Sequence, residues 1–409
     1  MSDEARILAI NSGSSSLRFA LYALGGPDVP GARERRVLSG LFQRIGQEAA
    51  ALRIADEGGH ALVEERLPLP DHAAAITRLT AWLAEAAPEH TPMGIGHRLV
   101  HGGPHHAHPA RVTDALLAEL RELVPLAPAH LPGALRAIEV LAQAYPALPQ
   151  VACFDTAFHQ TMPTVAKLLP LPRWLWDAGI RRFGFHGLSY EYIAGELARE
   201  GALPERVIVA HLGNGASMVA LRQGRSIETT MGFTPNGGLM MSTRSGELDP
   251  GVPLYLLRER GLSAEALAEL IERQSGLLGV SALSGDMRDV LASPDPRAAQ
   301  AVALFCYTAR KYIGALAAAL GGLELLVFTG GIGEHAPEVR RQICAGLGFL
   351  GLALDDARNQ GNQDVLSAEG SRVQIRRMAT NEELMIARHT RAILNDTLAS
   401  TNDTAPHGA

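Results

Sequence analysis

The sequence predicts an α/β protein built from two related domains, and three observations carry this prediction. At 409 residues, the chain is too long for one ordinary hydrophobic core. Segments with strand patterns are mixed with helical ones along the chain, as in α/β proteins. An apolar strand, a turn of Gly, Asn and Ser and a second, alternating strand occur in that order twice, from Ile7 and from Val207. We expect two hairpin-bearing domains that face each other across a cleft.

Composition and charge narrow the functional classes. The chain is 47% hydrophobic and 20% charged, which is typical of globular proteins, and its net charge is -6. Because no basic surface is indicated, we do not expect a nucleic-acid partner. The three cysteines, Cys153, Cys306 and Cys344, are widely spaced and form no CxxC pair. This spacing fits a reducing cytosol and argues against a disulfide framework or a cysteine-based zinc site.

The sequence also predicts a cytoplasmic protein with no membrane partner. The first six residues are polar and acidic, so we predict no signal peptide. The most apolar long stretch, 301–322, is interrupted by Arg310 and Lys311. We therefore expect a core helix there and not a membrane span.

The first hairpin reads "ILAINSGSSSLRFALY", Ile7 to Tyr22. The pattern predicts a strand, a tight turn and a second, half-buried strand. Gly13 lets the backbone turn or approach a ligand, and Ser14, Ser16 and Arg18 fall on one face of the second strand. Such donors beside free backbone N–H groups suit a phosphate. A polar hairpin without a ligand is the alternative at this point.

The elements after the first hairpin alternate between strands and helices. The sequence predicts a loop over 24–36, strands near 37–45 and 51–54, and a helix over 71–86 with Asp71 as its N-cap. A short strand follows in "GIGHRLVHGG", two helices flank "PLAPAHLPGAL", and "QVACFDTAFHQTMP" is a buried strand running into a polar loop.

Two later turns repeat the phosphate-binding character of the first. "VIVAHLGNGASMVALRQG" copies the hairpin design, and "LLVFTGGIGEHAPEVRRQI" is a strand, a Gly-rich turn and a helix start, which favours anions. No Gly-Lys-Ser/Thr occurs, so none is a Walker A loop, and Met218 replaces the third Gly of a Rossmann fingerprint. We therefore expect hairpins from two domains to hold the phosphates.

The histidine-rich stretch "GHRLVHGGPHHAHP" also admits a zinc site as an alternative. On a strand, His97 and His101 would share a face but lie about 13 Å apart, at ~3.3 Å per residue. They could not share one ion, so the pattern disfavours zinc.

Eight motifs together resemble the acetate kinase family. They are "INSGSSSLRF", "GHRLVHGG", "FDTAFHQTMP", "RRFGFHGLSYEY", "HLGNGAS", "MGFTPNGGLMMSTRSGELDPG", "FTGGIGEH" and "TNEELMIAR". The resemblance runs from about Ile7 to Leu394. The resemblance implies two duplicated actin-like ATPase (ribonuclease H-like) domains with the active site in the interdomain cleft. The implied domains are 1–155 plus 383–398 and 156–382, and the polar end, 399–409, is predicted to be disordered.

The resemblance implies reversible transfer of a phosphoryl group from ATP to acetate, giving acetyl phosphate and ADP. It further implies a Mg²⁺ requirement, with Mn²⁺ as an alternative, and a homodimer. A propionate or broader short-chain carboxylate kinase is the alternative within this class. An actin-like ATPase used in assembly or sensing would share the hairpins. Such a protein would not need Arg98, His186 and Arg244 around an acyl pocket, which disfavours it.

By resemblance, the catalytic residues are Arg98, Asp155, His186 and Arg244. The alternatives without a catalytic role are a surface salt bridge for Arg244 and a buried core position for His186. The role of Asp155 stays open, because a carboxylate substrate is already an anion and needs no base. Asp155 could hold Mg²⁺, orient Arg98 or, less plausibly, form an aspartyl phosphate.

The resemblance assigns the remaining site residues by motif. For the acyl substrate they are Arg98, Val100, His130, Phe185 and Pro235. For the nucleotide they are Ser14, Ser16, Arg18, His211, Leu212, Gly213, Asn214, Gly215, Asp286, Met287, Arg288, Gly331, Ile332, Gly333, Glu334 and His335. For the metal they are Asn11 and Glu382. "TNEELMIAR" also predicts a capping box, with Thr380 as N-cap and Glu383 at N3, which leaves Glu382 for the metal.

Several positions depart from the family pattern. They are Arg18 for Lys, Ala129 for Leu, Leu131 for Asn, Leu188 for Thr, Tyr190 for His and Ser242 for Gly. The smaller Ala129 could widen the methyl pocket for propionate, although Leu131 could fill the gap. Since one methylene changes binding by only about 1–3 kcal/mol, we expect overlap between acetate and propionate.

Overall fold

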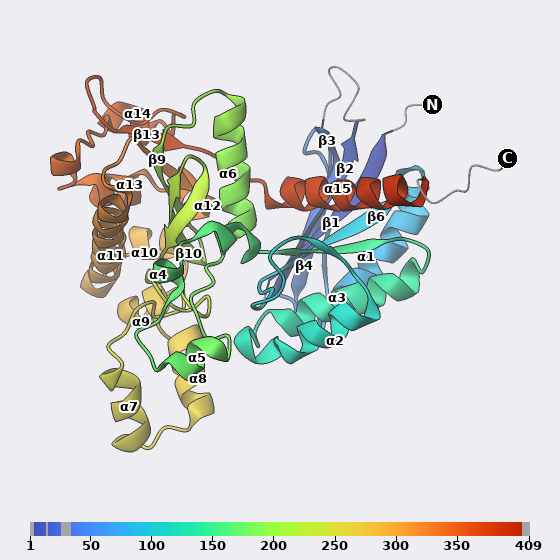
Figure 1. Ribbon diagram of the computed structural model, residues 1–409, viewed down its shortest axis with the longest axis horizontal. Helices are drawn as coiled ribbons and strands as arrows, with labels where there is room; N and C mark the ends of the chain where they lie inside the picture. The colour runs from blue at the N-terminus through green and yellow to red at the C-terminus, as the bar shows by residue number, and fades with distance from the viewer. Residues whose placement is uncertain (1–3, 14, 26–33, 403–409) are drawn as a thin grey trace. The chain divides into compact units, whose positions relative to one another are not determined.

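The computed structural model of the chain describes residues 4–13, 15–25 and 34–402. The chain divides into two compact units (Figure 1). Unit 1 comprises Met1–Ala157 and Asn381–Ala409, and unit 2 comprises Phe158–Thr380. The final helix, α15 (Glu382–Asn402), extends into the segment 399–409 for which the composition predicts disorder. The remainder of that segment, like Ser14 in the first turn, lies outside the described residues.

Unit 1 contains an eight-stranded sheet in the order β5-β4-β3-β2-β1-β6-β8-β7. β1 and β2 form the predicted antiparallel hairpin, β6 runs parallel to β1, and β8 runs parallel to β6. The bounds are β1 Ala5–Ser12, β2 Ser16–Leu24, β3 Glu34–Gln43, β4 Ala50–Asp56, β5 Ala61–Leu67, β6 Gly94–Leu99, β7 Ala110–Arg111 and β8 Gln150–Phe154.

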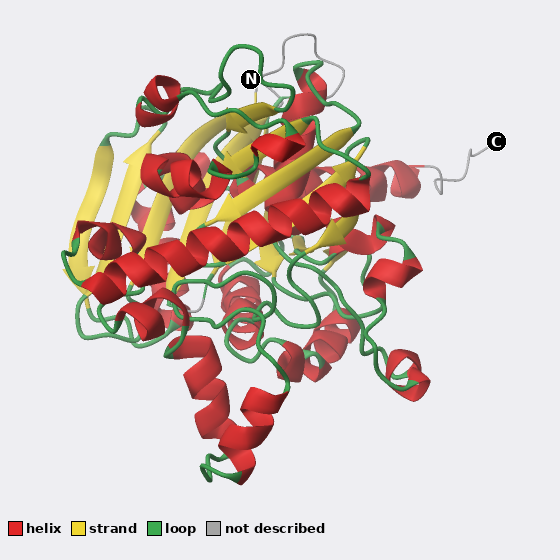
Figure 2. Ribbon diagram, turned by 90° about the vertical axis from the view of Figure 1, so that its left-hand side faces the viewer, coloured by secondary structure: helices red, strands yellow, loops and turns green. Residues whose placement is uncertain are grey.

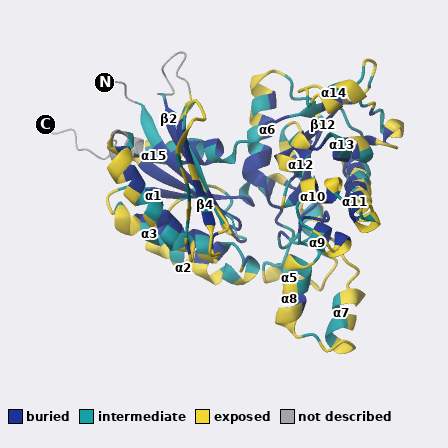
Figure 3. Cartoon of the chain, turned by 180° about the vertical axis from the view of Figure 1, so that it is seen from behind, coloured by how far each residue is buried: buried dark blue, intermediate teal, exposed yellow. Residues whose placement is uncertain are grey.

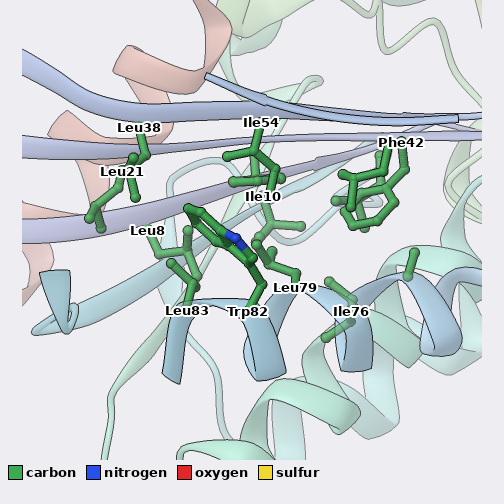
Figure 4. Packing of buried hydrophobic residues seen from close by; sticks show 14 of the residues in the cluster. Leu8, Ile10, Leu21, Leu38, Phe42, Ile54, Ile76, Leu79, Trp82 and Leu83 are labelled. Carbon is green, nitrogen blue, oxygen red and sulfur yellow. The ribbon is translucent and has the colours of Figure 1, made fainter. Parts of the chain in front are cut away.

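Helices cover both faces of this sheet. Leu79 and Trp82 of α1 (His72–Ala86) pack against Leu8, Ile10 and other apolar strand residues (Figure 4). Asp71 caps α1 by accepting from the Ala74 N–H, so the predicted N-cap is confirmed. On the opposite face, α15 lies close to β6 at Gly96, which has no side chain. A Cβ at this position would lie only 2.2 Å from Thr390 Oγ1. The other helices of unit 1 are η1 Pro88–His90, α2 Asp114–Glu122, η2 Val124–Leu126 and α3 Leu131–Ala144.

Unit 2 repeats the central strand order of unit 1. Its sheet is β11-β10-β9-β12-β13, with an antiparallel hairpin β9–β10 and with β12 and β13 parallel to β9. The bounds are β9 Arg206–Leu212, β10 Ala216–Arg222, β11 Arg225–Thr229, β12 Leu325–Thr329 and β13 Gln374–Arg377. The same arrangement, β3-β2-β1-β6-β8, occurs in unit 1, which explains the repeated hairpin pattern in the sequence.

Two helices cover the sheet of unit 2. α6 (Gly187–Arg199) packs on Val207 and Val209, and α11 (Pro296–Leu320) lies across the strands on the other side (Figure 2). The predicted core helix at 301–322 is thus part of α11. The other helices that begin in unit 2 or at its start are η3 Ala157–Thr161, α4 Thr164–Lys167, α5 Arg173–Asp177, α7 Gly251–Arg258, α8 Ala264–Arg273, α9 Gly276–Ser281, α10 Met287–Ala292, α12 Gly330–His335, α13 Pro337–Cys344, η4 Gly348–Leu350 and α14 Asp356–Gln360.

The strands of both sheets are mainly buried, whereas helices α7 and α8 expose much of their surface (Figure 3). Among residues 4–13, 15–25 and 34–402, no helix is both long enough and apolar enough to cross a bilayer.

Candidate active site

A cluster of polar residues in unit 1 lies where three neighbouring parallel strands end. Asn11 comes from the end of β1, Arg98 from β6, and Asp155 from the residue after β8, while Glu382 and Glu383 begin α15. The carboxyl ends of parallel strands are the usual place for ligands in α/β proteins. We call these five residues the Arg98 cluster.

Arg98 is fixed by its neighbours in this cluster. Its Nη2 lies 2.5 Å from Asp155 Oδ2, its Nε lies 3.0 Å from both Asp155 oxygens, and its Nη1 donates to Asn11 Oδ1 at 3.1 Å. The Asp155 side chain is 0% exposed. Burial alone would lower the pKa of Arg98, but the facing Asp155 and Glu382 carboxylates outweigh it and raise that pKa. Arg98 is therefore a permanently charged, oriented group.

The same cluster offers oxygen ligands to a divalent cation. Asn11 Nδ2 donates to Glu382 Oε2 at 2.9 Å and to Glu383 Oε1 at 3.0 Å. Burial and then the neighbouring Glu382 raise the pKa of Glu383, so negative charge is crowded at this point. Carboxylate and amide oxygens suit Mg²⁺, which keeps several waters. No group of three or more His, Cys, Asp or Glu side chains arranged for a metal occurs in the described part of the chain, so the fit rests on Asn11 and the two glutamates.

The predicted capping box at the start of α15 is wrong. Asn381, not Thr380, caps the helix, since its Oδ1 accepts from the Leu384 N–H at 3.0 Å. The same oxygen accepts from the Tyr22 hydroxyl at 2.9 Å. The Glu383 side chain turns to Asn11 instead of back to the N-cap, and thereby joins the Arg98 cluster. Sequence reasoning missed Glu383 as a site residue, although two adjacent glutamates at a helix start were a visible signal.

A second cluster surrounds the β9–β10 turn of unit 2. His186 is the N-cap of α6 with a left-handed backbone (φ 58°), a strained conformation of the kind that occurs at functional sites. Its Nδ1 lies 2.8 Å from Ser217 Oγ, and its ring stacks on that of His211 with centroids 4.3 Å apart. His211 Nδ1 lies 2.8 Å from Ser189 Oγ. His159 Nε2 donates to the carbonyl of Phe185 at 2.9 Å and so holds the segment before His186.

Arg244 and His186 meet at Gly215. A Cβ at Gly215 would lie 2.9 Å from Arg244 Nη2 and 3.1 Å from His186 Nε2, so a larger residue here would displace these side chains from their present positions. Arg244 Nη1 donates to the Pro235 carbonyl at 2.6 Å. The structure thus brings together five predicted site residues, His186, His211, Gly215, Pro235 and Arg244, which we call the His186 cluster.

Tyr190, which departs from the family pattern, supports His186. It is 0% exposed, and its hydroxyl forms a very short contact with Ser217 Oγ, the same oxygen that faces His186 Nδ1. A phenol is the stronger donor, so we assign a chain in which Tyr190 donates to Ser217 and Ser217 donates to His186. His186 then carries its proton on Nε2, toward Gly215 and Arg244.

The other predicted nucleotide segments of unit 2 adjoin the His186 cluster. Ser242 N–H donates to the Asn214 carbonyl at 3.2 Å, and a Cβ at Gly285 would lie 3.1 Å from the Ser242 carbonyl, which places the 285–288 segment beside this turn. A Cβ at Gly213 would lie 3.9 Å from Gly331 N at the start of α12. Asp286 caps α10 and pairs with Arg288 at 2.6 Å, and the Arg288 side chain is 89% exposed.

Some predicted residues are not gathered in these clusters. Among the acyl-site residues, Val100 and His130 belong to unit 1, whereas Phe185 belongs with Pro235 to unit 2. The side chains of Leu212 and Met287 are buried in the core. Glu334 accepts from the Gly330 N–H at 3.0 Å, and His335 is 70% exposed. Ser16 and Arg18 lie on β2, where Arg18 pairs in register with Asn11, and Ile332 and Gly333 lie in α12.

Two hydroxyls that sequence reasoning missed lie at strand ends. Ser12 Oγ ends β1, and Thr329 Oγ1 ends β12 just before Gly330. Both are buried and have no hydrogen-bond partner among the described residues. A hydroxyl residue directly before a glycine-containing turn was the available signal.

Comparison with known proteins identifies the family. A sequence model of the Acetokinase family matches residues 6–388. The chain belongs to the acetokinase family. "Acetate kinase" of Rhodopseudomonas palustris is 47% identical over 389 residues, which cover 94% of this chain and 97% of the relative. "Propionate kinase" of Citrobacter rodentium is 43% identical over 393 residues, which cover 94% of this chain and 95% of the relative.

Solved structures agree with this membership. Porphyromonas gingivalis acetate kinase has a TM-score of 0.83 and 35% identity over 95% of this chain and 100% of that one. A propionate kinase from Francisella tularensis has a TM-score of 0.87 and 35% sequence identity, and the match covers 95% of this chain and 99% of that chain. The predicted resemblance and the α/β fold of duplicated actin-like domains are confirmed. So is the enzyme class, a kinase of the acetate kinase type that uses ATP and a carboxyl acceptor.

Proposed function

We propose that this member of the family transfers the γ-phosphoryl group of ATP reversibly to acetate, giving acetyl phosphate and ADP. The observation that carries the proposal is the Arg98 cluster, in which a buried carboxylate orients an arginine beside oxygen ligands suited to a cation. Relatives named acetate kinase at 43–47% identity support the same substrate.

In this reaction Arg98 binds the acceptor carboxylate. A carboxylate is already a nucleophile at neutral pH, so the site must offset its charge against that of the phosphates and does not need a base. The Arg98 fork suits a planar carboxylate. Both oxygens of Asp155 accept from Arg98, and we therefore propose that Asp155 orients Arg98, the second of the three roles left open above.

His186 and Arg244 act on the phosphoryl group. With its proton on Nε2, His186 donates a hydrogen bond to an equatorial phosphoryl oxygen, while Arg244 offsets the charge that spreads over these oxygens. Gly215 of the β9–β10 turn lies against both side chains, which brings the backbone of this turn next to them.

Asn11, Glu382 and Glu383 would hold Mg²⁺, with Mn²⁺ as the alternative. The bound ion supplies positive charge to the phosphate oxygens of the nucleotide. The nucleotide itself contacts the β9–β10 turn, the start of α10 and the start of α12. We place the functional domains at 1–155 plus 383–398 and at 156–382, boundaries that lie near those of the two compact units.

Propionate is the second candidate substrate. A curated relative and a solved structure are both named propionate kinase, the latter with a TM-score of 0.87. Ala129 and Leu131 lie beside His130 at the start of α3, and the Leu131 side chain is 0% exposed. Because Leu131 is used in packing, we propose that the smaller Ala129 allows a longer acyl chain.

We also propose a cytoplasmic homodimer. The three cysteines are buried and form no disulfide bond in the described part of the chain, as in a reducing compartment where ATP is present. Unit 2 exposes large apolar side chains on α7, α9 and α11, among them Val252, Tyr255, Val280, Leu304 and Tyr307. Such exposure supports pairing with a second copy. Light scattering behind a sizing column would give twice the monomer mass of 43.5 kDa.

Trapping with hydroxylamine tests the proposed activity. The protein is incubated with Mg-ATP, hydroxylamine and either acetate, propionate or butyrate, and acyl hydroxamate is measured. We expect product with acetate and propionate and much less with butyrate. Arg98→Ala should abolish it, while Arg121→Ala, which removes an exposed arginine of the same unit, should not. ADP formation without hydroxamate would point to an ATPase and contradict the proposal.

A further inference from the structure

Unit 1 contains a cavity that shares Glu383 with the Arg98 cluster and Arg18 with the predicted nucleotide residues, while its remaining polar wall residues have no part in the proposed reaction. It has a volume of about 250 Å³ and lies over β2, β3 and β4 beside the start of α15. Its walls include Arg18, Tyr22, Arg36, Ser39, Arg53 and Glu383. We call it the arginine cavity.

The strand register explains how the arginines meet. Leu17, Phe19 and Leu21 of β2 point to the α1 side of the sheet, so Arg18, Ala20 and Tyr22 point to the other side. In register across β2, β3 and β4, Arg18 pairs with Leu41 and Leu41 with Arg53. The next row on this face is Ala20, Ser39 and Ala55, whose small side chains form the floor.

The third row places another arginine on the opposite side of this floor. Tyr22 pairs in register with Arg36. The cavity therefore has arginines on both sides of a floor of small residues. α15 packs against β1, β6, β8 and the adjoining β2, so the helix leaves this part of the face open within unit 1.

The charge of the arginine cavity is positive. Arg36 is exposed and has no hydrogen bond or ion pair among the described residues. Arg53 pairs with Glu64 at 3.1 Å, but both side chains are more than half exposed (60% and 65%), so the pair is weak and exchangeable. Glu383, the carboxylate on the wall, is held by Asn11 at 3.0 Å. The guanidinium groups of Arg18, Arg36 and Arg53 thus outnumber the one carboxylate of the wall, Glu383, which leaves the cavity with a net positive charge.

We propose that the arginine cavity binds a phosphate group, either as inorganic phosphate or on a small organic molecule. Guanidinium groups bind phosphate oxygens in pairs, and the Ser39 hydroxyl adds a donor from the floor. Ligand pockets for drug-sized molecules span ~300–1,000 Å³, so a cavity of about 250 Å³ suits a smaller ligand than ATP. The cavity adjoins the Arg98 cluster through Glu383, but Arg36, Ser39 and Arg53 take no part in the proposed transfer of the phosphoryl group.

Titration calorimetry with inorganic phosphate at low salt tests this site. The measurements use the full chain carrying Arg244→Ala, which weakens phosphate binding at the His186 cluster. In this background, Arg36→Ala and Arg53→Ala should each weaken phosphate binding by about 10-fold, as expected for lost charge-assisted hydrogen bonds. Arg66→Ala, on β5 outside the cavity, removes the same charge and should change the affinity less than twofold.

The outcomes separate the alternatives. An equal loss in all three variants would show a general charge effect, and unchanged affinity in Arg36→Ala and Arg53→Ala would show that the cavity binds no phosphate; either result overturns the proposal. A second arm with glycerol phosphate distinguishes the two ligand sources, since tighter binding than inorganic phosphate indicates an organic carrier. A double variant that carries Arg36→Ala and Arg53→Ala but keeps Arg244 should form hydroxamate at a rate near that of the unmodified protein. The proposed reaction is thus tested independently of this site.

Discussion

Arg98 and His186 each depend on a buried neighbour for their orientation. Asp155 accepts from Arg98 with both oxygens, and Ser217 faces His186 Nδ1 while Tyr190 faces Ser217. The sequence suggested Asp155 as one possible partner of Arg98, but it did not suggest Ser217 and Tyr190 as partners of His186, since Tyr190 and Ser217 lie on different elements, α6 and β10. Contacts between distant segments are visible only once the chain is folded.

The orientation of Arg98 leads to a prediction for Asp155→Asn. Asparagine cannot accept from Arg98 with two oxygens, so we expect Arg98 to lose its fixed position and turnover to fall about 100-fold or more. Hydroxamate formation measures the loss. Asp177→Asn makes the same replacement of a carboxylate by an amide at an exposed position and should leave the rate unchanged. A near-normal rate for Asp155→Asn would remove this residue from the mechanism.

The Tyr190 contact leads to a second prediction at this scale. In Tyr190→Phe, the Ser217 hydroxyl is free to accept from His186, which allows the proton to sit on Nδ1. We expect kcat to fall about tenfold, which is ~1.4 kcal/mol of transition-state stabilisation, with little change in KM for ATP. Steady-state kinetics give both constants, and Tyr192→Phe, a half-buried tyrosine on the same helix, serves as control. A change in KM alone would mean that Tyr190 only supports the fold.

At the scale of elements, local patterns predicted the hairpins well. Strand alternation and a glycine turn are local, and β1–β2 and β9–β10 form as expected. The N-cap of α15 was predicted wrongly because Thr380 and Asn381 are both good N-cap residues. Which of them caps the helix depends on Tyr22 from a distant strand. The short strands β7 and β13 also carry too few residues for a pattern.

The cap of α15 can be tested by a matched pair of variants. Asn381→Ala removes the acceptor for the Leu384 N–H and for the Tyr22 hydroxyl, so we expect the free energy of unfolding to fall by about 1–2 kcal/mol. Thr380→Ala should cost less, since Thr380 Oγ1 has no partner among the described residues. Urea denaturation followed by circular dichroism compares them. A larger cost for Thr380→Ala would restore the predicted capping box.

The β9–β10 turn provides a test by glycine substitution. A Cβ in Gly215→Ala would push against Arg244 and His186, at 2.9 and 3.1 Å, so we expect at least a tenfold loss of turnover with a stable fold. Gly195→Ala lies in α6, where nothing is within 4 Å of the new Cβ, and should stabilise the helix by about 0.5–1 kcal/mol. Full activity in Gly215→Ala would show that this close approach is not needed for the reaction.

At the scale of the whole molecule, both units are built on the same strand order, and each buries a neutral histidine. His97 in β6 contacts Gln150 at 2.6 Å, and His159 in unit 2 contacts Ser226 and Phe185. The duplicated order was predictable because the hairpin pattern repeats. These histidines were not predictable as core residues, since their burial depends on partners elsewhere in the sequence.

The two histidines predict how stability depends on pH. Burial lowers the pKa of both His97 and His159 from 6.5 to about 4. A lowered pKa means that the unfolded chain binds these protons first, so the stabilisation is complete above pH 6.5 and is lost as pH falls toward 4. We expect the free energy of unfolding to fall by up to about 1.4 kcal/mol per pH unit for each histidine within this window.

Urea denaturation between pH 8 and pH 5 measures the slope of the unfolding free energy against pH before most carboxylates titrate. His97→Gln and His159→Gln should each flatten the slope for their own unit, whereas His60→Gln, whose parent side chain is 83% exposed, should not. Equal slopes in all three variants would mean that neither buried histidine controls the acid sensitivity of the protein.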